Sequence, residues 1–390
     1  MNQPAPRAHG LDTLRSLAIL SVIAFHVNAF HGAGTILDSF VPIVRLGWMG
    51  VDLFFVLSGY LIGSQFMRPY LNGERPNLWG FYRNRLYRVL PVYLVVLALY
   101  YIVPVWAEDP TLSPLWQYLT FTQNLFVNYE VNQGFSHVWS LCVEEHFYLF
   151  LPLIVLPMMR KPSFRKTVGL LAGLVLFGIC IRSFILFHTL LPLDRAGQSY
   201  GLVYMERIYY PTYSRLDGLL AGVTLALVRT FRPLWWNALA KRGHTLLCLS
   251  VGLIGVAIWL FRDRWNSASG INAFGTAIGF PVLSLGLGFL VASALSTNGL
   301  LSKFKVPGAK LVATLAYSLY LTHKEMFHLV DRFFPDPDHA GGIEWVGMFA
   351  VSSVLVASVL YLCVERPFLL LRDKHRALQI ALPAPEQPSV

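Results

Sequence analysis

Long apolar stretches recur along the chain, each close to the roughly 20 residues that an α-helix needs to cross a bilayer. We predict ten membrane-spanning helices from them, over residues 11–30, 47–66, 89–106, 139–157, 168–191, 213–228, 244–261, 271–295, 311–330 and 343–371. In the second stretch, the four-residue spacing of Gly59 and Gly63 predicts a face for close helix packing. The pattern therefore predicts an all-α fold, a polytopic membrane bundle.

Basic residues gather in every second connection between these stretches. They follow the second, fourth, sixth and eighth stretches and return after the tenth, whereas residues 107–138 contain no lysine or arginine. The positive-inside rule then places these connections and both termini in the cytoplasm. We expect residues 1–375 to form one membrane domain without internal repeats. The Pro-rich tail, residues 376–390, is expected to be disordered.

Composition supports a membrane protein. The chain is 55% hydrophobic and 13% charged, and its mean hydropathy is +0.53, which excludes a soluble globular or a disordered protein. The net charge of +10 does not indicate nucleic-acid binding, because the basic residues lie in short clusters between apolar stretches. Four cysteines stand singly and are expected to be small core residues, not disulfide partners. No small-residue cleavage site follows the first stretch, so we expect it to remain uncleaved.

The first stretch, LDTLRSLAILSVIAFHVNAF, carries polar residues inside an apolar run. Arg15 and His26 are eleven residues apart, so on a helix they share a face and lie about 16 Å apart along the axis. Charges within a spanning helix are costly and typically functional. Two structural alternatives remain open: Arg15 could extend to the headgroups, and His26 could be a packing residue with its hydrogen bonds satisfied.

Other polar residues stand near the ends of predicted spans. Glu144 and Tyr148 share a face, and the adjacent Glu145 cannot face the same way, so at most one of the two acids lines a cavity. Asp52, Arg215 and Asp217 also lie near span ends, and Tyr320 and His323 share a face of the ninth span. The acids and Arg215 have a structural alternative as interfacial or helix-terminus residues, and for Tyr320 and His323 the alternative is a hydrated helix–helix contact. Glu365, at the inner end of the tenth span, is expected to be structural.

Several other chemistries are absent from the sequence. There is no phosphate-binding GxxxxGK motif, no HExxH and no GxSxG. His323 and His328 are five residues apart, a poor spacing for one metal, so we expect no metal. What remains is a histidine, an arginine and carboxylates within a bundle, as general acid–base chemistry requires.

Seven segments match one family in order. They are LDTLRSLAILSVIAFH, GVDLFFVLSGYLIG, FYRNRLYRVLPVY, VWSLCVEEHFYLFLP, YSRLDGLLAG, AYSLYLTH and VERP. With them the chain resembles acyltransferase family 3, membrane proteins that include bacterial O-acetyltransferases of cell-surface glycans. The resemblance implies an enzyme of about ten spans that uses cytoplasmic acyl-coenzyme A, usually acetyl-CoA. It also implies that Arg15 and His26 are required for activity and that Glu144 matters. No appended hydrolase-like domain is expected.

Our hypothesis from the sequence is an O-acyltransferase of the bacterial inner membrane. The acyl-CoA phosphates would meet Arg15, Arg83, Arg85 or Arg88, and His26 would be the general base for an acceptor hydroxyl, usually that of a glycan. Glu144 would orient the imidazole or hold the acceptor; the sequence does not choose between these roles. The acceptor-side candidates are Asp52, Arg215, Asp217, Tyr320 and His323. The alternatives are a proton-coupled transporter, which also uses intramembrane His, Arg and Glu, and a non-catalytic scaffold.

Overall fold

The computed structural model describes residues 9–31, 40–160, 163–262, 270–335 and 342–381, and within these ranges every regular element is helical. The long helices are α1 (His9–His31), α3 (Met49–Met67), α4 (Leu78–Ile102), α6 (Trp139–Arg160), α7 (Phe164–Ile185), α10 (Asp217–Phe231), α12 (Gly243–Phe261), α13 (Ala273–Ala294), α15 (Ala309–Phe333), α16 (Ile343–Leu360) and α17 (Arg366–Ala381). Short α-helices are α2 (Val41–Val44), α5 (Leu115–Leu119), α8 (Leu191–Arg195), α9 (Gly201–Tyr204), α11 (Pro233–Ala240) and α14 (Leu300–Lys303). Short 3-10 helices are η2 (Arg45–Trp48), η3 (Arg68–Asn72), η4 (Gln123–Leu125), η5 (Ser136–Val138) and η8 (Thr212–Ser214), and short π-helices are η6 (Leu186–Leu190), η7 (Met205–Tyr209) and η10 (Tyr361–Glu365). The predicted all-α class is confirmed.

Eight helical segments of the described chain are long and apolar enough to cross a membrane. They are His9–Ala29, Val41–Asn72, Leu78–Ile102, Ser136–Pro157, Phe164–Arg195, Gly243–Phe261, Ala273–Ala294 and Glu344–Arg376. The chain is therefore a multi-pass membrane protein. The sixth and ninth predicted spans correspond to α10 and α15, which are not among the eight. At 15 residues α10 is short, and α15 carries several charged residues, so the count of ten remains a prediction.

Two predicted boundaries differ from the structure. The third span was expected from residue 89, but α4 begins at Leu78, because the side chain of Asn77 caps the helix by accepting a hydrogen bond from the Gly80 N–H. The arginines expected in a basic loop before this span therefore lie partly on α4. Residues 376–381 continue α17 instead of joining the tail. Residues 1–8 and 382–390 lie outside the described ranges, so the cytoplasmic placement of the termini remains a prediction.

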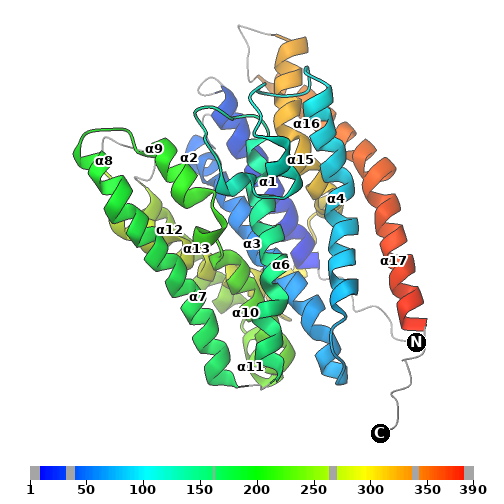
Figure 1. Cartoon of the computed structure of the whole chain (residues 1–390). Coiled ribbons are helices and arrows are strands. Elements are labelled where there is room, and N and C mark those ends of the chain that lie inside the picture. Colours follow the sequence, from blue (N-terminus) through cyan, green and yellow to red (C-terminus); the bar gives the residue numbers. More distant parts are fainter. Residues whose placement is uncertain (1–8, 32–39, 161–162, 263–269, 336–341, 382–390) are drawn as a thin grey trace.

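The helices form one bundle with α1, α3 and α15 at its middle (Figure 1). In this view α7 and α12 lie on one side, and α4 and α17 on the other. α1 packs against both α3 and α15, and α3 packs against α10. The predicted close contact at Gly59 is confirmed: a Cβ there would lie 2.1 Å from the Leu219 carbonyl oxygen of α10. Glycine lets the two backbones meet, and this contact holds the middle of the bundle together.

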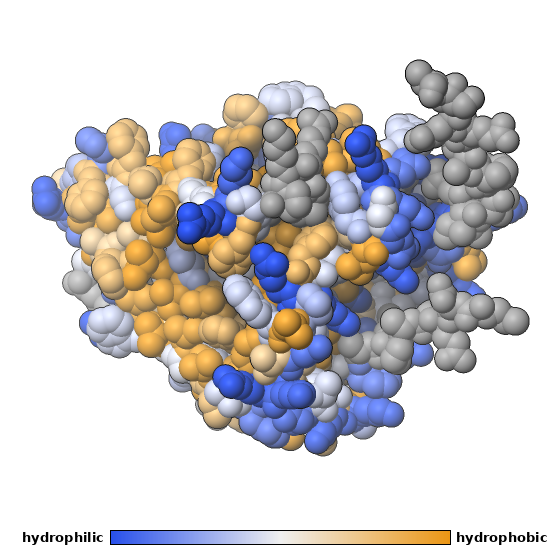
Figure 2. Space-filling model, turned by 90° about the horizontal axis from the view of Figure 1, so that it is seen from below, coloured by the Kyte–Doolittle hydropathy of each residue, from blue (hydrophilic) through white to orange (hydrophobic). Residues whose placement is uncertain are grey.

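Three of the basic connections lie at one end of the bundle. The connections from α3 to α4, from α6 to α7 and from α10 to α12 are at the lower end of Figure 1. Seen from that end, hydrophilic residues gather toward the side of α4 and α17, whereas hydrophobic residues cover more of the side of α7 and α12 (Figure 2). The basic residues of these three connections share one end of the bundle, the arrangement that the positive-inside rule describes.

Candidate active site

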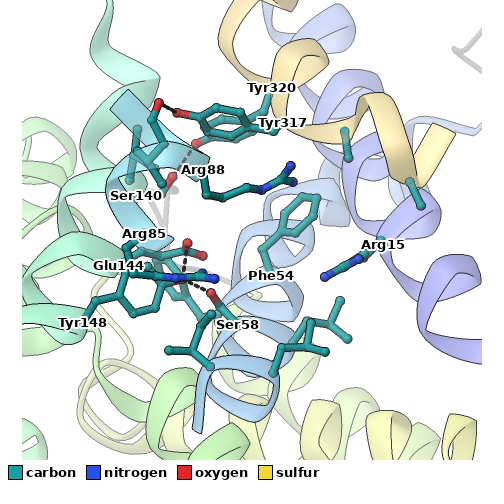
Figure 3. Close-up of a pocket in the computed structure, with 18 of the residues that line it drawn as sticks. Arg15, Phe54, Ser58, Arg85, Arg88, Ser140, Glu144, Tyr148, Tyr317 and Tyr320 are labelled. Carbon is teal, nitrogen blue, oxygen red and sulfur yellow. Dashed lines mark hydrogen bonds between the residues drawn. The ribbon is translucent and has the colours of Figure 1, made fainter. Parts of the chain in front are cut away.

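A cavity of about 430 Å³ lies between α1, α3, α4, α6, α15 and α17, within the range of small-molecule sites. Its polar wall consists of Arg15, Ser58, Gln65, Arg85, Arg88, Ser140, Glu144, Tyr148, Thr314, Tyr317, Tyr320, Tyr361 and Arg372. Figure 3 shows Arg15 entering from one side, with Arg85 and Glu144 opposite it. The cavity thus combines several guanidinium groups with a carboxylate and hydroxyl groups.

Only some of the arginines predicted to bind the donor line the cavity. Arg15, Arg85 and Arg88 line the cavity, but Arg83 does not. This division follows from the helix, because residues at spacings of two, three and five cannot all point one way. Arg372 on α17 also lines the cavity; sequence reasoning missed it because it treated the basic residues after the tenth span only as a topology signal.

One buried acidic residue holds a cavity arginine in place. Arg88 pairs with Glu365, which is 1% exposed and also accepts a hydrogen bond of 2.9 Å from Ser318 Oγ. The Arg88 guanidinium lies 5.6 Å from the centre of the Tyr317 ring. Glu365, expected to be structural, therefore orients a cavity arginine.

Glu144 faces the cavity on α6, and Glu145 is not part of its lining. Tyr148 Oη donates a hydrogen bond of 2.8 Å to Glu144 Oε2, as the four-residue spacing allows. Ser58 of α3 hydrogen-bonds the same Tyr148 hydroxyl, and the Arg85 guanidinium lies 5.7 Å from the centre of the Tyr148 ring. Glu144, Tyr148 and Ser58 form a connected polar group on the cavity wall (Figure 3).

His26 is paired with His323 across the contact of α1 and α15. The His26 Nδ1 atom lies 3.0 Å from His323 Nε2 and 3.0 Å from the Val22 carbonyl oxygen. Sequence reasoning placed His323 with the acceptor and did not foresee this pair, because the two residues are 297 positions apart. The His26 side chain is half-buried, whereas that of His323 is fully buried.

The hydrogen bonds determine the tautomer of both neutral rings. His323 Nδ1 lies 2.8 Å from the Tyr320 carbonyl oxygen and 3.3 Å from that of Leu319. Since carbonyl oxygens only accept, this nitrogen carries the proton, and His323 Nε2 is an acceptor. Both neighbours of His26 Nδ1 are then acceptors, so it carries the proton and shares it between them. The lone pair of His26 is therefore on Nε2.

Tyr320 connects the cavity to this pair. Its hydroxyl group lies on the cavity wall, donates a hydrogen bond of 2.7 Å to the His137 carbonyl oxygen and lies 2.5 Å from Ser140 Oγ. The centre of its ring is 5.9 Å from that of His323. The upper end of the cavity in Figure 3 is therefore one side chain away from the histidine pair.

Asp52, Arg215 and Asp217 do not line the cavity; each belongs to a buried ion pair. Arg215 Nη2 lies 2.9 Å from Asp52 Oδ1, and Arg182 Nη1 lies 2.7 Å from Asp217 Oδ2. Sequence reasoning missed Arg182, although a charge inside the fifth apolar stretch is itself a signal. A role for Asp52, Arg215 and Asp217 in binding the acceptor remains a prediction. In the structure their charged groups are occupied by ion pairs with each other or with Arg182.

The described chain is thus a helical membrane bundle with an arginine-lined cavity and a histidine pair next to it. The model of the acyltransferase domain of acyltransferase family 3 matches residues 8–363. The chain belongs to this family.

The curated relatives carry a consistent name. The chain is 26% identical over 385 residues to the O-acetyltransferase OatA of Staphylococcus aureus strain NCTC 8325 / PS 47, and equally similar to the proteins of that name from strains COL and MRSA252. The match covers 92% of this chain and 56% of each relative. The chain therefore spans just over half the length of these relatives. No solved structure matches the chain significantly.

Proposed function

We propose that this chain is an O-acetyltransferase of the bacterial inner membrane, which moves an acetyl group from cytoplasmic acetyl-CoA to a hydroxyl group of a cell-surface or exported glycan. The family and the name of its relatives support acyl transfer to oxygen. The observation that carries the proposal is the continuity of the site: arginines line a cavity whose far wall, at Tyr320, adjoins the His26–His323 pair.

The arginines of the cavity would bind the donor. Coenzyme A is polyanionic, and guanidinium groups bind phosphate oxygens through paired, charge-assisted hydrogen bonds. Arg15, Arg85, Arg88 and Arg372 supply such groups from three different helices, α1, α4 and α17. About 16 Å of helix separates Arg15 from His26, a distance that suits an extended pantetheine arm carrying the acetyl group toward the histidine.

His26 would act as the general base. Its Nε2 accepts the proton of the acceptor hydroxyl while the oxygen attacks the acetyl carbonyl carbon. The carbon–sulfur bond then breaks, and the imidazolium returns the proton to the departing thiolate of coenzyme A. Glu144 and His26 have different hydrogen-bond partners. Its partner is Tyr148, whereas the partners of His26 are Val22 and His323. We therefore assign the orienting role to His323 and a role in holding substrate to Glu144.

Acetyl transfer in sealed vesicles tests the proposal and the side of donor entry together. Inverted inner-membrane vesicles that contain the chain are expected to transfer label from radioactive acetyl-CoA to endogenous glycan. Right-side-out vesicles are expected to label only after permeabilisation, because acetyl-CoA does not cross the bilayer. Vesicles with His26→Gln are the control. Solute uptake without covalent label would favour the transporter alternative and contradict our proposal.

Two arginines of α4 offer a matched test of donor binding. Arg85 lines the cavity, whereas Arg83, two residues earlier, does not. Arg85→Ala is expected to raise the KM for acetyl-CoA on the order of tenfold, the loss of one charge-assisted contact, with a smaller effect on kcat. Arg83→Ala removes the same charge and should leave this KM unchanged. Equal KM values for wild type and Arg85→Ala would remove Arg85 from the donor site.

A further inference from the structure

A second group of ionisable side chains lies at the end of the bundle opposite the basic connections. Glu108 follows α4, His137 belongs to the η5 turn before α6, and Glu325 lies on α15. One side-chain ligand atom from each of the three residues lies within 4.8 Å of the other two. None of the three residues lines the cavity described above. We call Glu108, His137 and Glu325 the upper cluster.

Two members of the upper cluster are buried without partners. Glu325 is 0% exposed and His137 is 3% exposed. Neither carboxylate oxygen of Glu325 and neither ring nitrogen of His137 has a hydrogen-bond partner in the described chain. The Leu321 carbonyl lies near the His137 ring, but the pair lacks hydrogen-bond geometry. Four polar atoms in a closed site are therefore unsatisfied, which is costly unless a ligand binds them.

The third member is held in position by its neighbours. Tyr100 Oη donates a hydrogen bond of 2.5 Å to Glu108 Oε2, and the Phe135 N–H donates one of 3.2 Å to Oε1. Lys324 Nζ lies 3.0 Å from Glu108 Oε1 and 3.1 Å from Ser136 Oγ. Carboxylates that bind metals are commonly fixed by such hydrogen bonds. With about four lone-pair positions, the carboxylate keeps one for a further ligand.

The charges favour a cation. When ionised, the carboxylates of Glu108 and Glu325 contribute two negative charges and the ammonium group of Lys324 contributes one positive charge, so a bound cation would neutralise the charge left over in the closed site. The site is also too enclosed for a sugar or a coenzyme, because Glu325 is fully buried and outside the cavity. A ligand that matches both its size and its charge is a metal ion.

We propose that Glu108, His137 and Glu325 bind a divalent transition-metal ion, with Zn²⁺ as the best match. One imidazole nitrogen and two carboxylate oxygens are a ligand set that zinc accepts. Ligands placed tetrahedrally at about 2.1 Å from zinc are roughly 3.4 Å apart. Zinc binding would therefore bring the ligand atoms of the upper cluster closer together by no more than about 1.4 Å.

The metal would join three segments next to the reacting histidines. The centre of the His137 ring is 5.2 Å from that of His323, which in turn bonds His26. A bound ion would hold α15 to the start of α6 and to the segment after α4, and so keep His323 in place. Sequence spacing could not reveal the upper cluster, because its members come from three distant segments. The metal proposal is independent of the proposed acyl transfer.

Metal content tests the proposal directly. The full chain is purified in detergent with a histidine-free affinity tag from cells grown with added zinc. We expect about one zinc per chain by mass spectrometry, and X-ray absorption with only nitrogen and oxygen ligands at about 2.0–2.2 Å. Glu325→Gln and His137→Gln are each expected to lower zinc affinity on the order of tenfold or more. His328→Gln, one turn along α15 from Glu325, is the matched control and should keep its zinc.

Three results would overturn the proposal. They are a wild-type chain without zinc after growth in zinc and after dialysis against it, sulfur ligands in the absorption spectrum, or unchanged zinc content in Glu325→Gln. The first result would mean that a proton alone neutralises Glu325. The first two measurements use the wild-type chain, so they decide the question even if a cluster variant fails to fold.

Discussion

Replacing His26 by glutamine is expected to lower the kcat of acetyl transfer by a factor on the order of 10²–10⁴, the range for loss of a general base. Glutamine is nearly isosteric with histidine and can still donate toward His323 Nε2, but it cannot accept the proton of a hydroxyl group. Expression and membrane insertion should be unchanged. The KM for acetyl-CoA should change little, because Arg15 lies about three helical turns away. Transfer assays in detergent, with both substrates varied, measure these constants.

His323 variants separate a positioning role from a structural one. His323→Gln keeps a carbonyl oxygen that can accept from His26 Nδ1, whereas His323→Leu does not. If His323 sets the tautomer of His26, the glutamine variant should keep more of kcat than the leucine variant, at similar donor KM. His328→Gln on the same helix should behave like wild type. Near-normal transfer by His26→Gln would mean that the general base lies elsewhere and that our interpretation of α1 is wrong.

Replacing Asp52 by asparagine is expected to lower the free energy of unfolding by about 3–5 kcal/mol, the cost of breaking a buried ion pair from one side. Arg215, at 2% exposure, would lose its carboxylate partner while its guanidinium remained enclosed by aromatic rings, with Phe280 at 3.9 Å. Unfolding by detergent titration, followed by tryptophan fluorescence, measures the loss. If Asp52 instead binds the acceptor, the acceptor KM should rise while stability stays the same.

A double variant and an exposed pair provide the controls. Asp52→Leu with Arg215→Met replaces both charges by apolar groups, and such replacements are often neutral or stabilising. Recovery of stability in this double variant would show that the cost comes from the unpaired charge. Asp373→Asn breaks a pair with Arg372 in which the Asp373 side chain is 58% exposed, so it should change stability by no more than about 1 kcal/mol.

The sequence by itself determined the class of this protein, its helices and its family. The length of an apolar run is a local property, and a bilayer accepts only runs long enough to cross it. For this reason the stretches expected at 11–30 and 47–66 were found as α1 and α3. The seven ordered motifs indicated the family that matches residues 8–363. Boundaries were less certain where a cap such as Asn77 extended a helix beyond its apolar part.

Only the tertiary structure decided which polar side chains meet. α1 and α3 are apolar on nearly all sides, so no amphipathic pattern shows which face of each helix is turned inward. Rotation and register between helices then set the partners: His26 meets His323, Arg88 meets Glu365, and Asp52 meets Arg215. These pairs join residues 297, 277 and 163 positions apart. Their energies depend on distances across the bundle, which no local pattern in the chain encodes.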